Sequence, residues 1–277
     1  MQHNSKNDPQ LPSAAIFLSP HYDDVVLSCG GTVARLADGG PTPVVVTIFA
    51  GAILDELLTE FASWKHARWG IDSVDDVQAQ RQAEDLDAGA ILGCRMRWLG
   101  YPDAIYRANR YASDAELFGT VHSTEAGLID LIAGEIRSLP EWRDHITIYV
   151  PLGVGDHVDH QLIYAVGQRL AVSGARVFAY EDCPYAIHTP AAVDRRLAAR
   201  AGEIGPAEYV ALGAAIERRI SAIQAYQSQL PVIFRFTNDV ATTVRTYAQR
   251  IGGAIGPAER FWPLTAATDA DRQLMAE

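Results

Sequence analysis

Apolar runs of strand length alternate with stretches of helical spacing over the first two thirds of the chain. The run at 44–49 is rich in β-branched residues, which is typical of a strand buried on both faces. The stretch at 77–93 has helical spacing and ends at a glycine, a common stop signal. The predicted strands are 14–18, 44–49, 94–100, 146–150 and 175–182, and the predicted helices between them are 29–38, 77–93, 124–138 and 158–172.

This alternation predicts an α/β fold with a mostly parallel sheet built from right-handed crossovers. Residues 52–75 look irregular and are expected to pass over the sheet. Beyond residue 185 the order is less regular, apart from a helix predicted at 215–230. Because no repeat, low-complexity segment or linker divides the chain, we expect one domain over residues 1–277, with 1–13 as a flexible tail.

Polar side chains follow the ends of these strands, where ligands bind in parallel sheets. The first strand leads into His21, Asp23 and Asp24, and the fourth leads into His157, Asp159 and His160. His157 and His160 are three residues apart at the start of a helix, so they share roughly one face. Two imidazoles and the carboxylate of a His21-x-x-Asp24 segment make a three-ligand set with an open position, the pattern of a catalytic zinc site.

A divalent cation also explains why two adjacent aspartates follow a buried strand, because it offsets their mutual repulsion. One aspartate then binds the metal while its neighbour faces a bound water whose pKa is lowered toward ~7. The second histidine, held by Asp159, stabilises an oxyanion or protonates a leaving group. The alternatives are an ordinary turn or helix cap at the two aspartates, a cap at Asp156, and solvent-exposed histidines.

The balance of charge narrows the choice of partners. The chain has 23 Lys and Arg against 34 Asp and Glu, a net charge of −11, which argues against nucleic acid or an anionic membrane surface. Its three cysteines form no C-x-x-C, which favours a reducing compartment. The N-terminus is polar and the apolar run at 44–54 is too short to span a bilayer, so we expect a cytoplasmic protein without membrane insertion. The sequence does not predict the oligomeric state.

At this point the chain resembles the PIG-L-like, or LmbE-like, zinc-dependent N-deacetylases. The segments "PHYDD" and "HVDH" are similar to the two family signatures, His-Pro-Asp-Asp-Glu and His-x-Asp-His. Further similarities follow in the family's order and cover most of residues 14–230: "GGTVARLADGG", "RQAEDLDAGAILG", "LGYPD", "YEDCPYA" and "AIQAYQSQL". The resemblance implies a Rossmann-like three-layer fold and hydrolytic removal of an acetyl group from an N-acetylglucosamine-type sugar or its conjugate.

The resemblance also implies roles for individual residues. His21, Asp24 and His160 are expected to bind Zn²⁺, with Fe²⁺ as an alternative metal. Asp23 is expected to be the general base. A protonated His157, oriented by Asp159, is expected to stabilise the oxyanion or act as general acid. Tyr22 and Val25 replace the proline and glutamate of the first signature, which leaves the metal ligands in place and puts the substrate in doubt.

Three further groups have two interpretations each. Arg81 either binds a sugar hydroxyl or phosphate or forms a solvated i,i+4 pair with Asp85. Asp103 either accepts hydrogen bonds from sugar hydroxyls or closes an Asx-turn after Pro102. The loops expected over the site carry three aromatic residues, Trp64, Trp69 and Tyr106. Their rings either stack on the substrate or are buried in a small separate hydrophobic cluster.

Two other classes of function compete with a deacetylase. Two histidines and one carboxylate also describe non-haem Fe(II) oxygenases, but a second aspartate has no obvious task in oxygen activation. A catalytically inactive Rossmann-like binding module is the non-enzymatic alternative. The first loop has only Gly30-Gly31 and no G-x-G-x-x-G, so a dinucleotide fingerprint is absent. Hydrolysis of a different amide at the same zinc site is a further alternative.

Overall fold

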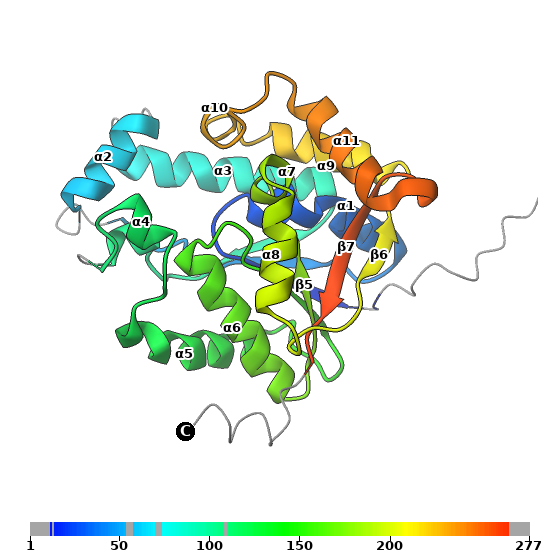
Figure 1. Ribbon diagram of the computed structural model, residues 1–277, viewed down its shortest axis with the longest axis horizontal. Helices are drawn as coiled ribbons and strands as arrows, with labels where there is room; N and C mark the ends of the chain where they lie inside the picture. The colour runs from blue at the N-terminus through cyan, green and yellow to red at the C-terminus, as the bar shows by residue number, and fades with distance from the viewer. Residues whose placement is uncertain (1–11, 13, 54–57, 70–73, 108–109, 266–277) are drawn as a thin grey trace, which may run out of the picture.

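The computed structural model describes residue 12 and residues 14–53, 58–69, 74–107 and 110–265. The strands in this part of the chain form one seven-stranded sheet in the order β3-β2-β1-β4-β5-β7-β6 (Figure 1). They are β1 (Ala15–Ser19), β2 (Val44–Thr47), β3 (Arg95–Trp98), β4 (Thr147–Pro151), β5 (Arg176–Tyr180), β6 (Glu208–Ala211) and β7 (Ala258–Pro263).

The order in which the strands are added to the sheet changes side at β1: β2 and β3 lie on one side of β1, and β4 lies on the other. Strands β1, β2 and β3 pair in parallel on one side, and β4 pairs in parallel with the other edge of β1. Strand β5 continues in parallel, whereas β7 runs antiparallel to both β5 and β6. The carboxyl ends of β1 and β4 therefore meet at a topological switch point, where open α/β sheets bind their ligands.

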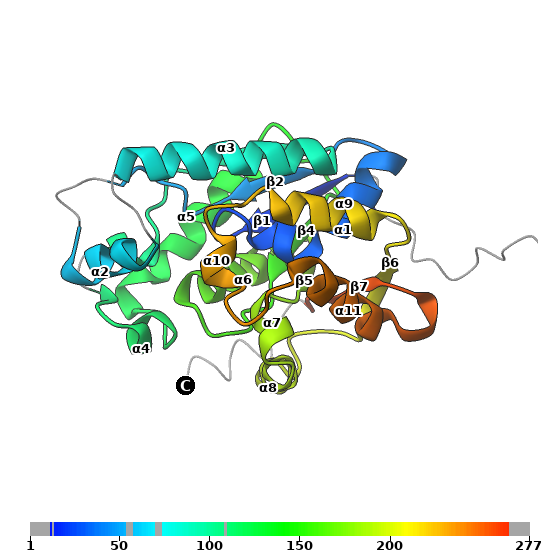
Figure 2. The same ribbon diagram turned by 90° about the horizontal axis from the view of Figure 1, so that it is seen from above.

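Helices cover both faces of the sheet, so the fold has three layers. Helices α1 (Asp24–Gly39), α3 (Val74–Leu92) and α9 (Ala215–Gln224) pack on one another, with α11 (Val240–Gly252) beside α9. On the other face, α5 (Ala126–Arg137) packs on α6 (Val158–Val172). Figure 2 shows α2 (Glu60–Trp69) and α4 (Asp114–Leu117) at the end of the molecule opposite β6 and β7. The remaining short helices are α7 (Tyr185–His188), α8 (Ala191–Ala199) and α10 (Leu230–Ile233).

The central strands are apolar because they are buried on both faces. All residues of β1, β2 and β4 are buried. Phe17 of β1 stacks on Tyr149 of β4, with ring centroids 4.3 Å apart. Burial of a large apolar side chain contributes about 1.5–3 kcal/mol, so the packing of these strands stabilises the edge of the sheet that carries the site.

Helix α1 contains a kink that its sequence allows. Cys29 has φ −142°, outside the helical region, and the following residues are Gly30 and Gly31. The kink frees main-chain N–H groups, and Gly31 and Thr32 donate them to the carboxylate of Glu259 at 3.0 and 2.8 Å. A Cβ on Gly31 would lie 2.8 Å from Leu212, so glycine is required there for packing.

The predicted α/β class with a mostly parallel sheet is confirmed, and the five predicted strands correspond to β1–β5. Two expectations were wrong. Residues 60–69 form α2 rather than an irregular loop, while 54–57 and 70–73 lie outside the described residues. The helix predicted at 215–230 ends at Gln224, because Tyr226 and Ser228 turn inward to bond Asp85 and Glu84.

In the described part of the chain, every helix is too short or too polar to cross a membrane.

Candidate active site

The residues predicted to form the site meet at the carboxyl ends of β1 and β4. His21 and Asp23 lie between β1 and α1, and Asp24 is the first residue of α1. His157 caps α6, and Asp159 and His160 belong to its first turn. The fold thus brings together two segments that are more than a hundred residues apart, and their side chains are almost wholly buried.

His21, Asp24 and His160 can share one metal ion. One donor atom from each lies within 4.8 Å of the other two. Asp24 Oδ2 is 3.2 Å from His21 Nδ1 and 3.3 Å from His160 Nε2. The same oxygen accepts the main-chain N–H of His21 at 2.8 Å, which fixes the turn between β1 and α1.

His21 and His160 each have a second carboxylate at the ring nitrogen that does not face Asp24. His160 Nδ1 is 2.6 Å from Asp182, and His21 Nε2 is 3.0 Å from Asp159. Metal-binding histidines commonly donate their second nitrogen to a carboxylate in this way. Asp182 also accepts the N–H groups of Gly153 and Val154 at 2.8 Å each. Sequence reasoning left Asp182 out, although its position directly after β5 was a usable signal.

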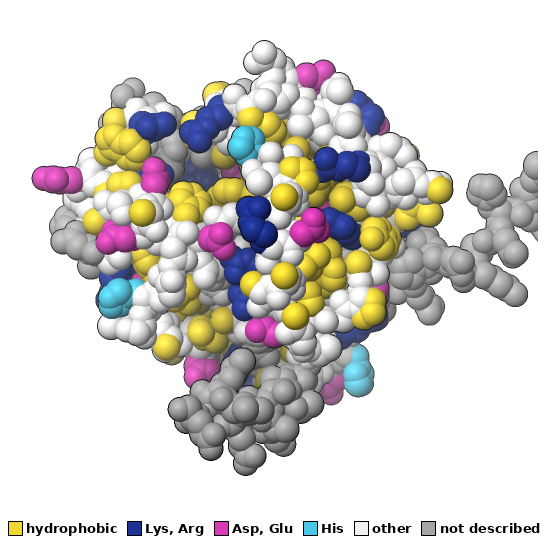
Figure 3. Space-filling view, viewed as in Figure 1, with side chains coloured by type: hydrophobic (Ala, Val, Ile, Leu, Met, Phe, Trp, Pro, Cys, Tyr) yellow, Lys and Arg dark blue, Asp and Glu magenta, His cyan; other side chains and the backbone are white. Residues whose placement is uncertain are grey.

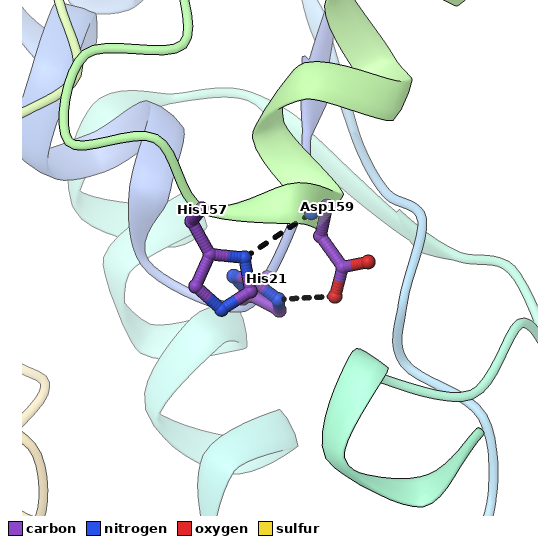
Figure 4. Close-up of side chains that lie close together, drawn as sticks. All are labelled: His21, His157 and Asp159. Atoms are coloured by element: carbon purple, nitrogen blue, oxygen red, sulfur yellow. Dashed lines mark hydrogen bonds and ion pairs between the residues drawn. The ribbon is translucent and has the colours of Figure 1, made fainter. Parts of the chain in front are cut away.

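A second group of donor atoms, from His21, His157 and Asp159, lies equally close together (Figure 4). Here His157 Nδ1 accepts the main-chain N–H of Asp159 at 3.2 Å. Burial lowers the pKa of His157 well below 6.5, and His21 adds to this effect. A neutral ring that accepts at Nδ1 carries its proton at Nε2, which is then a hydrogen-bond donor. Burial therefore favours a neutral ring, which differs from the protonated His157 expected from the resemblance.

Asp159 is the most enclosed carboxylate of the site. Its oxygens contact His21 Nε2, the main-chain N–H of Ala104 at 3.0 Å and Arg107 Nη1 at 2.6 Å. Arg107 in turn forms two hydrogen bonds to Glu125, at 2.7 and 3.1 Å. Asp159 thus meets His157 through its main chain, while its side chain faces His21 (Figure 4).

The carboxylates around the histidines create a negative environment that suits a divalent cation. Burial disfavours a charged imidazole, yet Asp24 and Asp182 outweigh it and raise the pKa of His160 to about 9. The pKa of His21 is likewise well above 6.5 despite burial, because Asp103, Asp159 and Asp24 surround it. The surrounding carboxylates thus favour a positive charge at both rings. A divalent cation would supply that charge and leave both rings neutral, so the residues fit a metal.

Asp23 adopts an unusual main-chain conformation beside this group. Its φ is +84°, which costs a non-glycine residue about 1–3 kcal/mol and is typical of functional sites. Burial, together with the neighbouring Asp24, raises the pKa of Asp23 to about 8, while Arg81 opposes the shift. Arg81 Nη2 is 3.9 Å from Asp23 Oδ2. The surroundings of Asp23 therefore favour its protonated form more than those of an exposed carboxyl group do.

A small pocket opens beside Asp23, with Arg81 and Asp103 in its wall. It is lined by Tyr22, Phe49, Ala50, Gly51, Ile53, Gln78, Arg81, Asp103, Tyr106 and Gln229. Asp103 Oδ1 also accepts the N–H of Ile105, which forms the expected Asx-turn, while its other oxygen, Oδ2, lies 3.5 Å from His21 Nε2. The solvated Arg81–Asp85 pair is wrong, because Asp85 is 1% exposed. Sequence reasoning missed Gln78 and Gln229, since a lone glutamine gives no pattern that marks a binding site.

The aromatic residues expected over the site have different surroundings. Tyr106 is buried, and its hydroxyl lies 2.5 Å from His66 Nε2 of α2. Trp64 lies on α2 and is 44% exposed. The side chain of Trp69 lies outside the described residues.

Comparison with known proteins agrees with this geometry. A model of the PIG-L family, described as GlcNAc-PI de-N-acetylase, matches residues 16–171, which is more than half of the chain. The chain belongs to this family, as the resemblance of its motifs indicated.

Its relatives include two curated enzymes and a solved structure. The 2'-N-acetylparomamine deacetylase of Niallia circulans is 28% identical over 94% of both chains. The enzyme of the same name from Streptomyces fradiae is 29% identical over 77% of this chain and 72% of its own. The crystal structure of a deacetylase from teicoplanin biosynthesis has a TM-score of 0.76 and 25% identity, covering 92% of this chain and 99% of that one.

Proposed function

We propose that this protein is a metal-dependent hydrolase that removes the N-acetyl group from an N-acetylglucosamine-type sugar within a larger conjugate. The observation that carries the proposal is the convergence of three metal-binding donor atoms beside a buried Asp23 and an N–H donor on His157. Membership of the PIG-L family and similarity to sugar-conjugate deacetylases support it.

His21, Asp24 and His160 would hold the metal. Three protein ligands leave positions for water and substrate, as in catalytic zinc sites. Zinc is the proposed ion, and ferrous iron is the alternative because it accepts the same donor set. When bound, such an ion supplies a Lewis acid for the amide oxygen and lowers the pKa of a bound water.

Asp23 acts as the general base. It removes a proton from the attacking water as the oxygen bonds to the acetyl carbon, and it later gives this proton to the amine nitrogen as the C–N bond breaks. The products are acetate and a free amino sugar. Burial and Asp24 raise the pKa of Asp23 to about 8, and a divalent cation held at the neighbouring ligands would lower it, which would favour the ionised base at neutral pH.

His157 stabilises the negative charge that develops on the carbonyl oxygen. The main-chain N–H of Asp159 occupies Nδ1, so Nε2–H is the free donor. A preorganised donor of this kind contributes a factor of about 10²–10³ to the rate. Arg81 and Asp103, which line the pocket, bind the sugar hydroxyl groups.

Hydrolysis of a panel of N-acetylated amino sugars tests the proposal. Protein stripped with chelator and then reloaded with Zn²⁺ or Fe²⁺ is assayed for both amine and acetate. Asp23→Asn is the matched control, because it preserves size and removes the base. We expect equal amounts of both products from reloaded protein only, with Asp23→Asn inactive. Turnover that survives chelation, or in Asp23→Asn, contradicts the mechanism.

A further inference from the structure

Three partly exposed aromatic rings lie together outside the pocket. Phe61 and Trp64 of α2 stack with centroids 5.8 Å apart, and Phe118 follows α4 directly. Trp64 and Phe118 are 44% and 36% exposed. We call Phe61, Trp64 and Phe118 the aromatic rim. In Figure 3 apolar side chains gather with basic ones over α2, at the upper left.

The aromatic rim is continuous with the candidate active site. The edge of Phe118 meets the ring of His157, with centroids 5.3 Å apart. The rim is also held in place from below, because His66 of α2 contacts the hydroxyl of Tyr106 in the pocket wall. A group attached to a sugar bound at His157 would therefore lie close to Phe118.

Positive charges lie on the faces of the rim. Lys65 Nζ is 5.2 Å from the ring centre of Phe61, 5.6 Å from Trp64 and 5.9 Å from Phe118. The guanidinium of Arg68 lies 4.7 Å from the ring centre of Trp64. Lys65 is paired with Asp114, whereas the guanidinium of Arg68 lies over the ring of Trp64. A cationic ligand would be repelled here, and a neutral or acidic aromatic group would not.

We propose that the aromatic rim is a subsite for the aglycone of the substrate, and that this aglycone is aromatic or flat and apolar, and neutral or acidic. The inference rests on the proposed function, since the sugar must sit at His157. This subsite disfavours a polycationic aminocyclitol as the group attached to the sugar, because the guanidinium of Arg68 would repel it.

Steady-state kinetics with matched glycosides provide the first test. The substrates are phenyl and methyl N-acetylglucosaminide, which share the reacting sugar, and 2'-N-acetylparomamine. In Trp64→Ala we expect KM for the phenyl glycoside to rise about twofold to tenfold, with kcat and the methyl glycoside unaffected. Leu131→Ala, 63% exposed on α5, is the control and should change nothing. Equal effects on phenyl and methyl substrates, or a preference for 2'-N-acetylparomamine, would overturn the proposal.

Binding measured without turnover separates this inference from the proposed function. Calorimetry compares phenyl and methyl glucosaminide, the products, on wild type, Trp64→Ala and Trp64→Phe. We expect tighter binding of the phenyl compound to wild type, its loss in Trp64→Ala and its retention in Trp64→Phe. Equal affinities of wild type for both compounds refute the subsite. A phenyl preference that depends on Trp64, without hydrolysis of any amide, refutes the proposed function alone.

Discussion

His157 Nδ1 accepts the main-chain N–H of Asp159 at the start of α6, at 3.2 Å. The helix cap and the proposed oxyanion donor are thus the same side chain. Because the cap occupies Nδ1, the proton of the neutral ring is placed on Nε2. A local feature of helix geometry thereby selects the tautomer that the proposed chemistry needs.

Replacement of His157 should lower kcat without releasing the metal. We expect His157→Ala to reduce kcat about 10²–10³-fold, because the transition state loses one preorganised donor. Metal content by elemental analysis should equal that of wild type. His160→Ala is the comparison and should lose bound metal. If His157→Ala also loses its metal, the second donor group, with His21 and Asp159, is the correct one.

Asp182 should control metal affinity from behind His160. We expect Asp182→Asn to weaken metal binding about 10–100-fold, since the carboxylate holds Nδ1 of the ligand at 2.6 Å. Excess metal should restore its activity. Glu181→Gln is the matched control, because this neighbouring buried carboxylate contacts Tyr247 and Arg260 instead. A competitive chelator titration measures both affinities, and equal values would contradict the role of Asp182.

Asp85 should make the free energy of unfolding depend on pH. It is 1% exposed and accepts bonds from Trp98 Nε1 at 2.7 Å and Tyr226 Oη at 2.6 Å. Burial raises its pKa above 3.8, although these two donors oppose the shift. Above the unfolded pKa the folded state then binds more protons than the unfolded state, so stability falls as pH rises toward the folded pKa.

Urea unfolding of wild type and Asp85→Asn at several pH values isolates this contribution. We expect the stability of wild type relative to Asp85→Asn to fall as pH rises above 3.8 and to level off beyond the folded pKa. A tenfold change in proton affinity corresponds to about 1.4 kcal/mol. A pH-independent difference between the two proteins would show that Asp85 is ionised equally in both states.

Arg107 should be essential for stability rather than for catalysis alone. Its side chain is 5% exposed and lies between the buried carboxylates of Glu125 and Asp159. We expect Arg107→Ala to lose about 3–5 kcal/mol of unfolding free energy, because two buried charges are left without a partner. Thermal or denaturant unfolding measures this loss. A change below about 1 kcal/mol, the value of an exposed pair, would mean that water replaces the guanidinium.

Much of the site was predictable because its residues are close in sequence or follow strands. The segments around His21 and His157 each carry their polar residues within four positions, directly after apolar runs. A parallel sheet aligns the ends of its strands, so the meeting of these segments followed from the strand pattern. By contrast, α2 was missed because its low amphipathicity and two tryptophans resemble those of a surface loop. Strands β6 and β7 were missed because they lie beyond residue 185, where strands and helices no longer alternate regularly.

The sequence by itself determined the α/β class, the five parallel strands and the two clusters of histidine and aspartate at their ends. These features are local, since they depend on periodicity and on which residue follows which. The tertiary structure alone decided which nitrogen of each histidine faces inward, that Asp182 holds His160, and that Asp159 turns to His21 and Arg107. Such choices depend on contacts between distant segments, and in a close-packed interior these contacts, rather than local preference, set side-chain orientation.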